Sequence, residues 1–151
     1  MNRYTASLLL LLGLFLAGVV NAQPLLMVRA QQSFPETMLA LQGVISDHGY
    51  RVSRVQRVDI GLTASGYATD KYRIVFYGKP EQVRSLTAKY PQLIPYLPQK
   101  ITIFAEEGDT LVTTVDPSFY RKLVADPEAH AIFKQWRSDV ESMLDEISGA
   151  E

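Results

Sequence analysis

The sequence contains no cysteine and only two histidines, His48 and His130. The lack of cysteine excludes a disulfide scaffold, a thiol nucleophile, a zinc–cysteine site, an iron–sulfur cluster and a lipid-modified cysteine. Two histidines are too few for a histidine-rich metal cage. The sequence also has no Walker loop and no G-x-G-x-x-G, H-E-x-x-H, G-x-S-x-G or EF-hand motif. From the sequence we therefore assign no cofactor, no metal site and no catalytic residue.

The chain has no excess of positive charge. Its 151 residues include 15 Lys and Arg against 16 Asp and Glu, which gives a formal net charge of -1. Because this balance produces no overall field that attracts nucleic acid, we expect no nucleic-acid partner. Hydrophobic residues make up 47% and charged residues 21% of the chain. This composition is typical of a globular protein, and the length suits a single domain.

Only one long apolar run is present, LLLLLGLFLAGVV at residues 8–20. Arg3 precedes it, and Val20-Asn21-Ala22 follows with small side chains at the first and third positions. This pattern predicts a signal peptide over residues 1–22 that is cleaved between Ala22 and Gln23. The run is shorter than the roughly 20 residues of a spanning helix, and an uncleaved N-terminal anchor is the alternative. We expect a periplasmic or secreted protein with no stable membrane span after cleavage.

Residues 23–151 show strand and helix patterns within one domain. Residues 33–36 (SFPE) form a capping box ahead of apolar residues at helical spacing. Valines at every third position of residues 51–58 fit a strand that contains a bulge. The small residues of 61–70 predict a turn. We predict strands at residues 25–28, 51–58, 71–77, 101–105 and 110–115, and helices at residues 34–48, 81–90 and 127–147.

The last two predicted strands are separated only by residues 106–109. A four-residue connection makes a hairpin, and a hairpin requires antiparallel strands. We therefore predict an α+β two-layer sandwich, with a mainly antiparallel sheet of four to five strands and three helices, rather than a doubly wound parallel sheet. Apolar side chains lie on both faces of the predicted strands, so both faces need a cover. The last helix, a partner subunit or an apolar ligand, in that order, are the candidates for the second face.

Three segments resemble a known family, the domain of unknown function 302 family. They are a helix that ends in His48-Gly49-Tyr50, residues 73–80 (RIVFYGKP), and a hydrophobic hairpin that ends in Asp116-Pro117. The resemblance covers residues 25–120. Residues 81–98 differ from the Gly-rich turn of many members, and the helix at residues 127–147 is an addition. The resemblance implies a compact α+β fold that can pair as a homodimer, and it implies no established activity.

The charges are unevenly distributed along the chain. Residues 51–100 contain nine basic and three acidic residues, whereas residues 101–151 contain four basic and eleven acidic ones. Because arginine side chains match carboxylate and phosphate geometry, we predict an anion-binding face at Arg54, Arg73 and Tyr77. Two alternatives remain open: the basic and acidic parts pair within the chain, or the basic face meets the acidic face of another subunit.

The remaining polar residues have simpler interpretations. His48 is expected to lie at a helix C-terminus and His130 at the surface of the last helix. Glu106, Glu107 and Asp109 could bind a hard cation, but a solvated hairpin tip is the simpler interpretation.

From these features we predict an exported small binding or interaction module. Its partner is a second copy, an envelope protein, or an anionic or amphipathic ligand. The alternative is an enzyme that acts on an anionic envelope metabolite, with Tyr77 or His48 transferring a proton.

Overall fold

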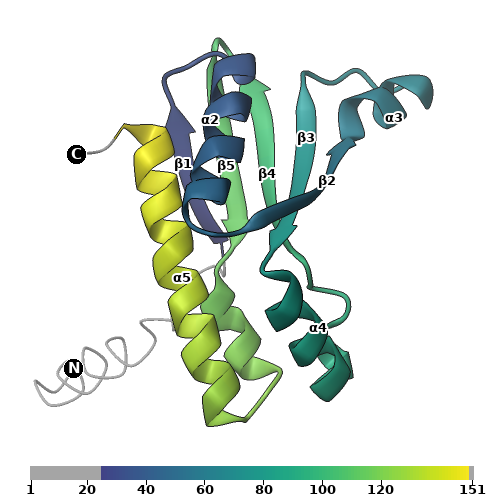
Figure 1. The fold of residues 1–151 in the computed structure, drawn as a ribbon. Helices are drawn as coiled ribbons and strands as arrows, with labels where there is room; N and C mark the ends of the chain where they lie inside the picture. The colour runs from purple at the N-terminus through teal and green to yellow at the C-terminus, as the bar shows by residue number, and fades with distance from the viewer. Residues whose placement is uncertain (1–24, 150–151) are drawn as a thin grey trace, which may run out of the picture.

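The computed structural model describes residues 25–149, and Figure 1 shows how they fold. The predicted signal peptide and its cleavage site lie outside these residues. Five strands and four α-helices follow in the order β1 (Leu25–Ala30), α2 (Phe34–Asp47), β2 (Arg51–Arg57), α3 (Val58–Ala64), β3 (Tyr72–Gly78), α4 (Pro80–Lys89), β4 (Gln99–Glu106), β5 (Asp109–Val115) and α5 (Pro127–Ser148). Two short 3-10 helices, η1 (Pro91–Leu93) and η2 (Pro117–Lys122), precede β4 and α5 respectively.

The two long helices begin at the residues that the sequence indicates. At α2, the Glu36 carboxylate of the capping box accepts from the backbone N–H of Ser33 at 3.1 Å and from the Ser33 hydroxyl at 2.6 Å. At α5, the Asp126 carboxylate accepts from the backbone N–H of Glu128 at 2.8 Å, with Pro127 in the first turn. In both cases a side chain satisfies backbone donors that a helix leaves free at its start.

The five strands form one antiparallel sheet in the order β1-β5-β4-β3-β2. The predicted bulge is confirmed, because the register of β2 against β3 shifts between Val52 and Arg54. The predicted hairpin is shorter than expected: Glu106 pairs with Asp109, so the loop consists of Glu107 and Gly108 alone. Both loop residues have positive φ angles, 51° and 99°, as a tight two-residue turn of this kind requires.

The predicted turn at residues 61–70 is wrong in its first part, where the chain forms α3. None of the α3 residues is buried. Its end is closed by backbone hydrogen bonds, such as Ser65 N–H to the Gly61 carbonyl at 3.2 Å. An ion pair between Asp59 and Arg73 links α3 to β3. Small residues with no apolar stripe give no helical periodicity, so the sequence pattern favoured a turn.

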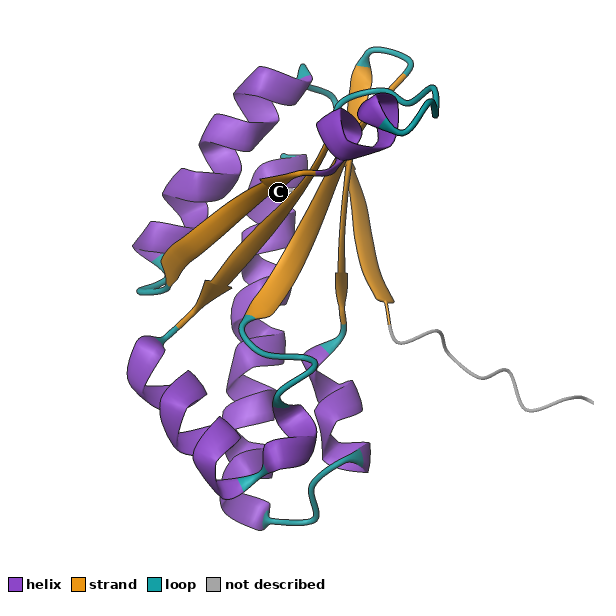
Figure 2. Cartoon of the chain, turned by 90° about the vertical axis from the view of Figure 1, so that its right-hand side faces the viewer, coloured by secondary structure: helices purple, strands orange, loops and turns teal. Residues whose placement is uncertain are grey.

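Helices α2 and α5 pack beside each other on one face of the sheet (Figures 1 and 2). The strand residues Val75, Ile101, Ile103 and Val112 point toward them and are fully buried. The largest buried helix side chains come from α5 and α2, namely Trp136, Phe133, Met143, Val140, Leu41 and Ile45. The core therefore lies between this pair of helices and one face of the sheet.

The other face of the sheet has no helix over it within residues 25–149 (Figure 2). The expectation that the last helix covers this second face is wrong, because α5 lies beside α2 instead. Successive strand side chains point to opposite faces, so the strand register identifies the residues of this surface, which we call the open face. It consists of Leu25, Met27, Arg29, Arg51, Arg54, Gln56, Tyr72, Ile74, Phe76, Gly78, Lys100, Thr102, Phe104, Glu106, Asp109, Leu111, Thr113 and Val115.

The cap of α5 generates a prediction about pH. Hydrogen bonds from the Tyr90 hydroxyl, the Lys89 ammonium and the Glu128 N–H lower the pKa of Asp126. A carboxyl group whose pKa is lowered by folding stabilises the fold above its unfolded pKa of about 3.9, and this contribution is lost as the pH falls. Asp126→Ala should therefore lower Tm at pH 7, and the difference from wild type should shrink in acid.

Thermal unfolding followed by circular dichroism between about pH 2 and about pH 7 measures this difference. Asp145→Ala is the matched control, since Asp145 is an exposed carboxyl of the same helix. A Tm difference for Asp126→Ala that stays constant with pH would contradict the assigned role of its charge.

Candidate functional site

The structure does not bring the three predicted anion-binding residues together. Arg54 pairs with Phe76 and points to the open face. Arg73 and Tyr77 alternate with Phe76 along β3, so they point to the face that the helices cover. The prediction of a single site at Arg54, Arg73 and Tyr77 is therefore corrected, because the pleat of the sheet separates its members.

Tyr77 is a core residue. Its side chain is 0% exposed, and its ring packs edge-on against Tyr50 with 5.5 Å between the ring centres. Its hydroxyl lies 3.4 Å from the Gln99 side-chain oxygen, and burial raises its pKa. A buried phenol that holds its proton this firmly is unsuited to proton transfer with a ligand from solvent.

Arg73 is occupied by a contact within the chain. Its guanidinium pairs with the Asp59 carboxylate and lies 5.7 Å from the centre of the Phe34 ring. The hydrogen bond from Arg73 lowers the pKa of Asp59, so the carboxylate stays charged. Both residues belong to the basic part of the chain. The pairing of the basic part with the acidic part, which the sequence left open, occurs instead between Lys79 and Asp139 at 3.7 Å and between Lys89 and Asp126 at 2.9 Å.

The two histidines also have partners within the chain. His48 Nε2 lies 2.7 Å from a carboxylate oxygen of Glu146, which links the end of α2 to α5. His130 Nε2 lies 2.6 Å from the Val124 carbonyl oxygen, and this side chain is half-buried rather than at the surface as predicted. Both histidines therefore join elements of the fold.

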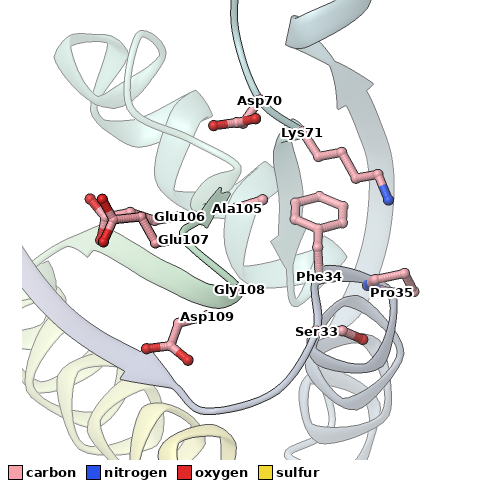
Figure 3. Close-up of a pocket in the computed structure, with 10 residues that line it drawn as sticks. All are labelled: Ser33, Phe34, Pro35, Asp70, Lys71, Ala105, Glu106, Glu107, Gly108 and Asp109. Atoms are coloured by element: carbon pink, nitrogen blue, oxygen red, sulfur yellow. The ribbon is translucent and has the colours of Figure 1, made fainter.

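One end of the open face is acidic. At the same end of the molecule, but on the side of α2, a pocket of about 540 Å³ lies between the start of α2, the segment before β3 and the β4–β5 hairpin. Figure 3 shows the Phe34 ring near Lys71, with Glu106, Glu107 and Asp109 on the hairpin side. Arg29 pairs with the Glu106 carboxylate and lies 3.8 Å from that of Asp109. The two hairpin carboxylates are thus partly neutralised by an arginine of β1.

The opposite end of the open face is basic. Arg54 and Lys100 flank Phe76 there, and Arg54 forms no ion pair with any residue of 25–149. The ammonium of Lys100 lies 5.8 Å from the centre of the Phe76 ring and donates to the Pro95 carbonyl. The face therefore changes from positive to negative along the direction of its strands.

A second pocket, of about 280 Å³, lies beyond this basic end, between β2, β3 and α4. We call it the α4 pocket. Its lining residues are Arg51, Ser53, Gly78, Pro80, Val83, Arg84 and Pro98. Sequence reasoning missed it, although the segment Gly78-Lys79-Pro80 and the bulge in β2 mark two of its walls. The third wall is formed by α4, and the sequence does not show where this helix lies relative to β2 and β3.

Residues 25–149 contain no helix with the length and apolar character of a membrane span. The same residues contain no group of three or more histidines, aspartates and glutamates arranged to hold a metal ion.

The fold is that of a small α+β sandwich with one open sheet face. Residues 26–147 match the family described as the domain of unknown function DUF302, and the chain belongs to this family. No curated protein matches it in sequence.

A solved structure confirms the fold. It is that of an uncharacterised conserved DUF302 protein from Bacillus stearothermophilus, with a TM-score of 0.74 and 19% sequence identity. The similarity covers 83% of this chain and 99% of that one. At this identity the comparison establishes the shared fold. The family resemblance that the sequence indicated is thus confirmed, and the match extends to α5, which the resemblance treated as an addition.

The assignment of Tyr77 to the core predicts a clear effect on stability. Tyr77→Ala removes a fully buried aromatic side chain and should lower the free energy of unfolding by about 3–5 kcal/mol. Tyr67→Ala is the matched control, because the Tyr67 side chain is 65% exposed; its effect should be within about 0.5 kcal/mol. Urea denaturation measures both, and equal effects would place Tyr77 outside the core.

Proposed function

We propose that the protein is an exported interaction module whose binding surface is the open face, and that a second copy of the chain is its partner. One observation carries the proposal: an entire face of the five-stranded sheet is rich in apolar side chains and has no cover within residues 25–149. Leu25 is 45% and Met27 is 56% exposed on it. Extended apolar surfaces of this kind mark interaction sites.

The charges of the open face favour a second copy over other partners. Lys100 and Glu106 both belong to β4 and point to the same face, six positions apart. A two-fold axis that crosses the strands at the level of Ile103, midway between Lys100 and Glu106, would stack two faces with their strands reversed. The basic end of each copy would then meet the acidic end of the other, with Lys100 directed toward Glu106 of the second copy.

The apolar residues fit the same arrangement. Reversal about Ile103 places Ile74 over Tyr72 of the second copy on β3, and Phe104 over Thr102 on β4. Two sheets that pack face to face in this way bury both sets of side chains as in a β-sandwich. A surface that is complementary to itself in both charge and shape satisfies the requirement of a symmetric dimer.

The export part of the proposal rests on the signal-peptide pattern of residues 1–22 and places the module in the periplasm or outside the cell. An envelope protein or an anionic or amphipathic ligand are the other possible occupants of the open face. Native mass spectrometry of protein purified gently from its own envelope distinguishes them. A mass of two bare chains supports the dimer, whereas one chain with a bound small molecule contradicts it.

A charge-swap series tests the predicted register. Lys100→Glu places two carboxylates opposite each other, and Glu106→Lys places two ammonium groups opposite each other. Each should raise the dimer dissociation constant about tenfold or more, because like charges that face each other across an interface are costly. The double variant restores opposite charges and should recover most of the affinity. Sedimentation at a series of concentrations measures all three.

Lys134→Glu is the control for the change in net charge, since Lys134 is exposed on α5, away from the open face. It should leave the dissociation constant unchanged. A wild-type protein that is monomeric at all concentrations would overturn the proposed partner. A double variant as weak as its parents would overturn the register.

A further inference from the structure

The α4 pocket is a cavity at the basic end of the molecule, and two of its lining residues, Arg51 and Gly78, lie at the margin of the open face. We infer that it binds a monoanionic carboxylate that carries an apolar body, such as a medium-chain acyl carboxylate. The inference rests on the proposed binding role of the module, but it depends on β2, β3 and α4 rather than on the hairpin end of the sheet.

The floor of the pocket is apolar and closely packed. Gly78, Pro80, Val83 and Pro98 supply it. The backbone at Gly78 approaches α4 so closely that a Cβ there would lie 2.8 Å from Cγ2 of Val83. Glycine is the residue that permits such an approach. The close contact fixes the position of α4 against β3, so the cavity keeps a defined shape for an apolar group.

The rim of the pocket carries one uncompensated positive charge. Two arginines line it, and Arg84 is paired with Glu81 at 2.9 Å. Arg51 forms no ion pair within residues 25–149. A guanidinium group matches the two oxygens of a carboxylate, and a single free charge balances a monoanion better than a phosphate dianion.

The first turn of α4 adds to this preference. Pro80 lines the pocket and is the first residue of the helix, so the positive end of the helix dipole lies beside the cavity. No side chain caps this end: Lys79 makes no capping hydrogen bond. The Ser53 hydroxyl, also in the lining, donates its proton to the Phe76 carbonyl at 3.2 Å, so Arg51 rather than Ser53 supplies the donors for a carboxylate.

The volume sets the size of the ligand. At about 280 Å³ the pocket is slightly smaller than the roughly 300–1,000 Å³ of cavities that hold drug-sized molecules. A short acyl or aryl body fits such a space, whereas a two-chain lipid does not. Octanoate is a suitable probe because it combines one carboxylate with a short apolar chain.

Calorimetric and NMR titrations of the full chain with octanoate, 1-octanol and octylamine test the inference. Octanoate should bind with the highest affinity and shift the amide signals of Gly78 and Val83. Arg51→Ala should weaken octanoate about tenfold or more, the usual effect of losing a charged hydrogen bond. Arg51→Glu should reverse the preference, so that octylamine binds more tightly than octanoate.

Arg57→Ala is the matched control, because Arg57 is exposed on the same strand but is not part of the pocket. It should leave octanoate affinity unchanged. Gly78→Ala is a second test of the floor: it should weaken octanoate and 1-octanol alike by displacing α4. If the Gly78→Ala variant does not fold, the comparison of Arg51→Ala with Arg57→Ala still tests whether the pocket binds octanoate.

Three results would overturn the inference: no saturable binding of octanoate, equal affinity for octanoate and 1-octanol, or equal losses in Arg51→Ala and Arg57→Ala. The outcome is separable from that of the dimer. Glu106→Lys lies at the other end of the sheet and should retain octanoate affinity while it weakens self-association. A monomeric protein that binds octanoate through Arg51 would contradict the proposed partner and support the pocket.

Discussion

The whole architecture depends on the packing of α2 and α5 against a single face of the sheet. Phe133 and Trp136 of α5 are buried and pack against the ring of Tyr120 in η2, at 5.6 and 6.3 Å between ring centres. The Trp136 indole N–H donates to the Gln82 side chain at 2.9 Å, which also links α4 to this layer. Once both long helices are used on one side, the alternation of strand side chains leaves the other side without a cover. The open face is therefore a direct consequence of how the core is built.

The charge asymmetry of the sequence takes a definite spatial form on this sheet. Basic residues of β2 and β4 gather beside α4, and acidic residues gather at the hairpin. Some opposite charges are paired within the chain, as in Arg73 with Asp59 and Arg29 with Glu106. Arg51 and Arg54 have no ion pair within residues 25–149, and they lie at the same end. Some arginines are therefore paired within the chain, whereas Arg51 and Arg54 form the basic end of the open face.

Local signals made much of the fold predictable. The capping box at Ser33, the aspartate before Pro127 and the valine spacing of β2 each report a local backbone requirement, and each prediction is confirmed. The site was less predictable because it depends on contacts between distant segments. The alternation of side chains along β3, taken together with the predicted bulge in β2, could have placed Arg54 and Tyr77 on opposite faces of the sheet. The α4 pocket could not be derived, because it needs the position of a helix relative to two strands.

The bulge in β2 also bears on how far the protein can assemble. β2 is an edge strand, and its kink together with three arginines discourages the addition of another strand at that edge. At the opposite edge, α5 packs against β1. Growth by strand addition, the route to open-ended fibres, is thereby hindered at both edges. An association that uses the face alone ends at two copies, so the geometry favours a closed particle over a polymer.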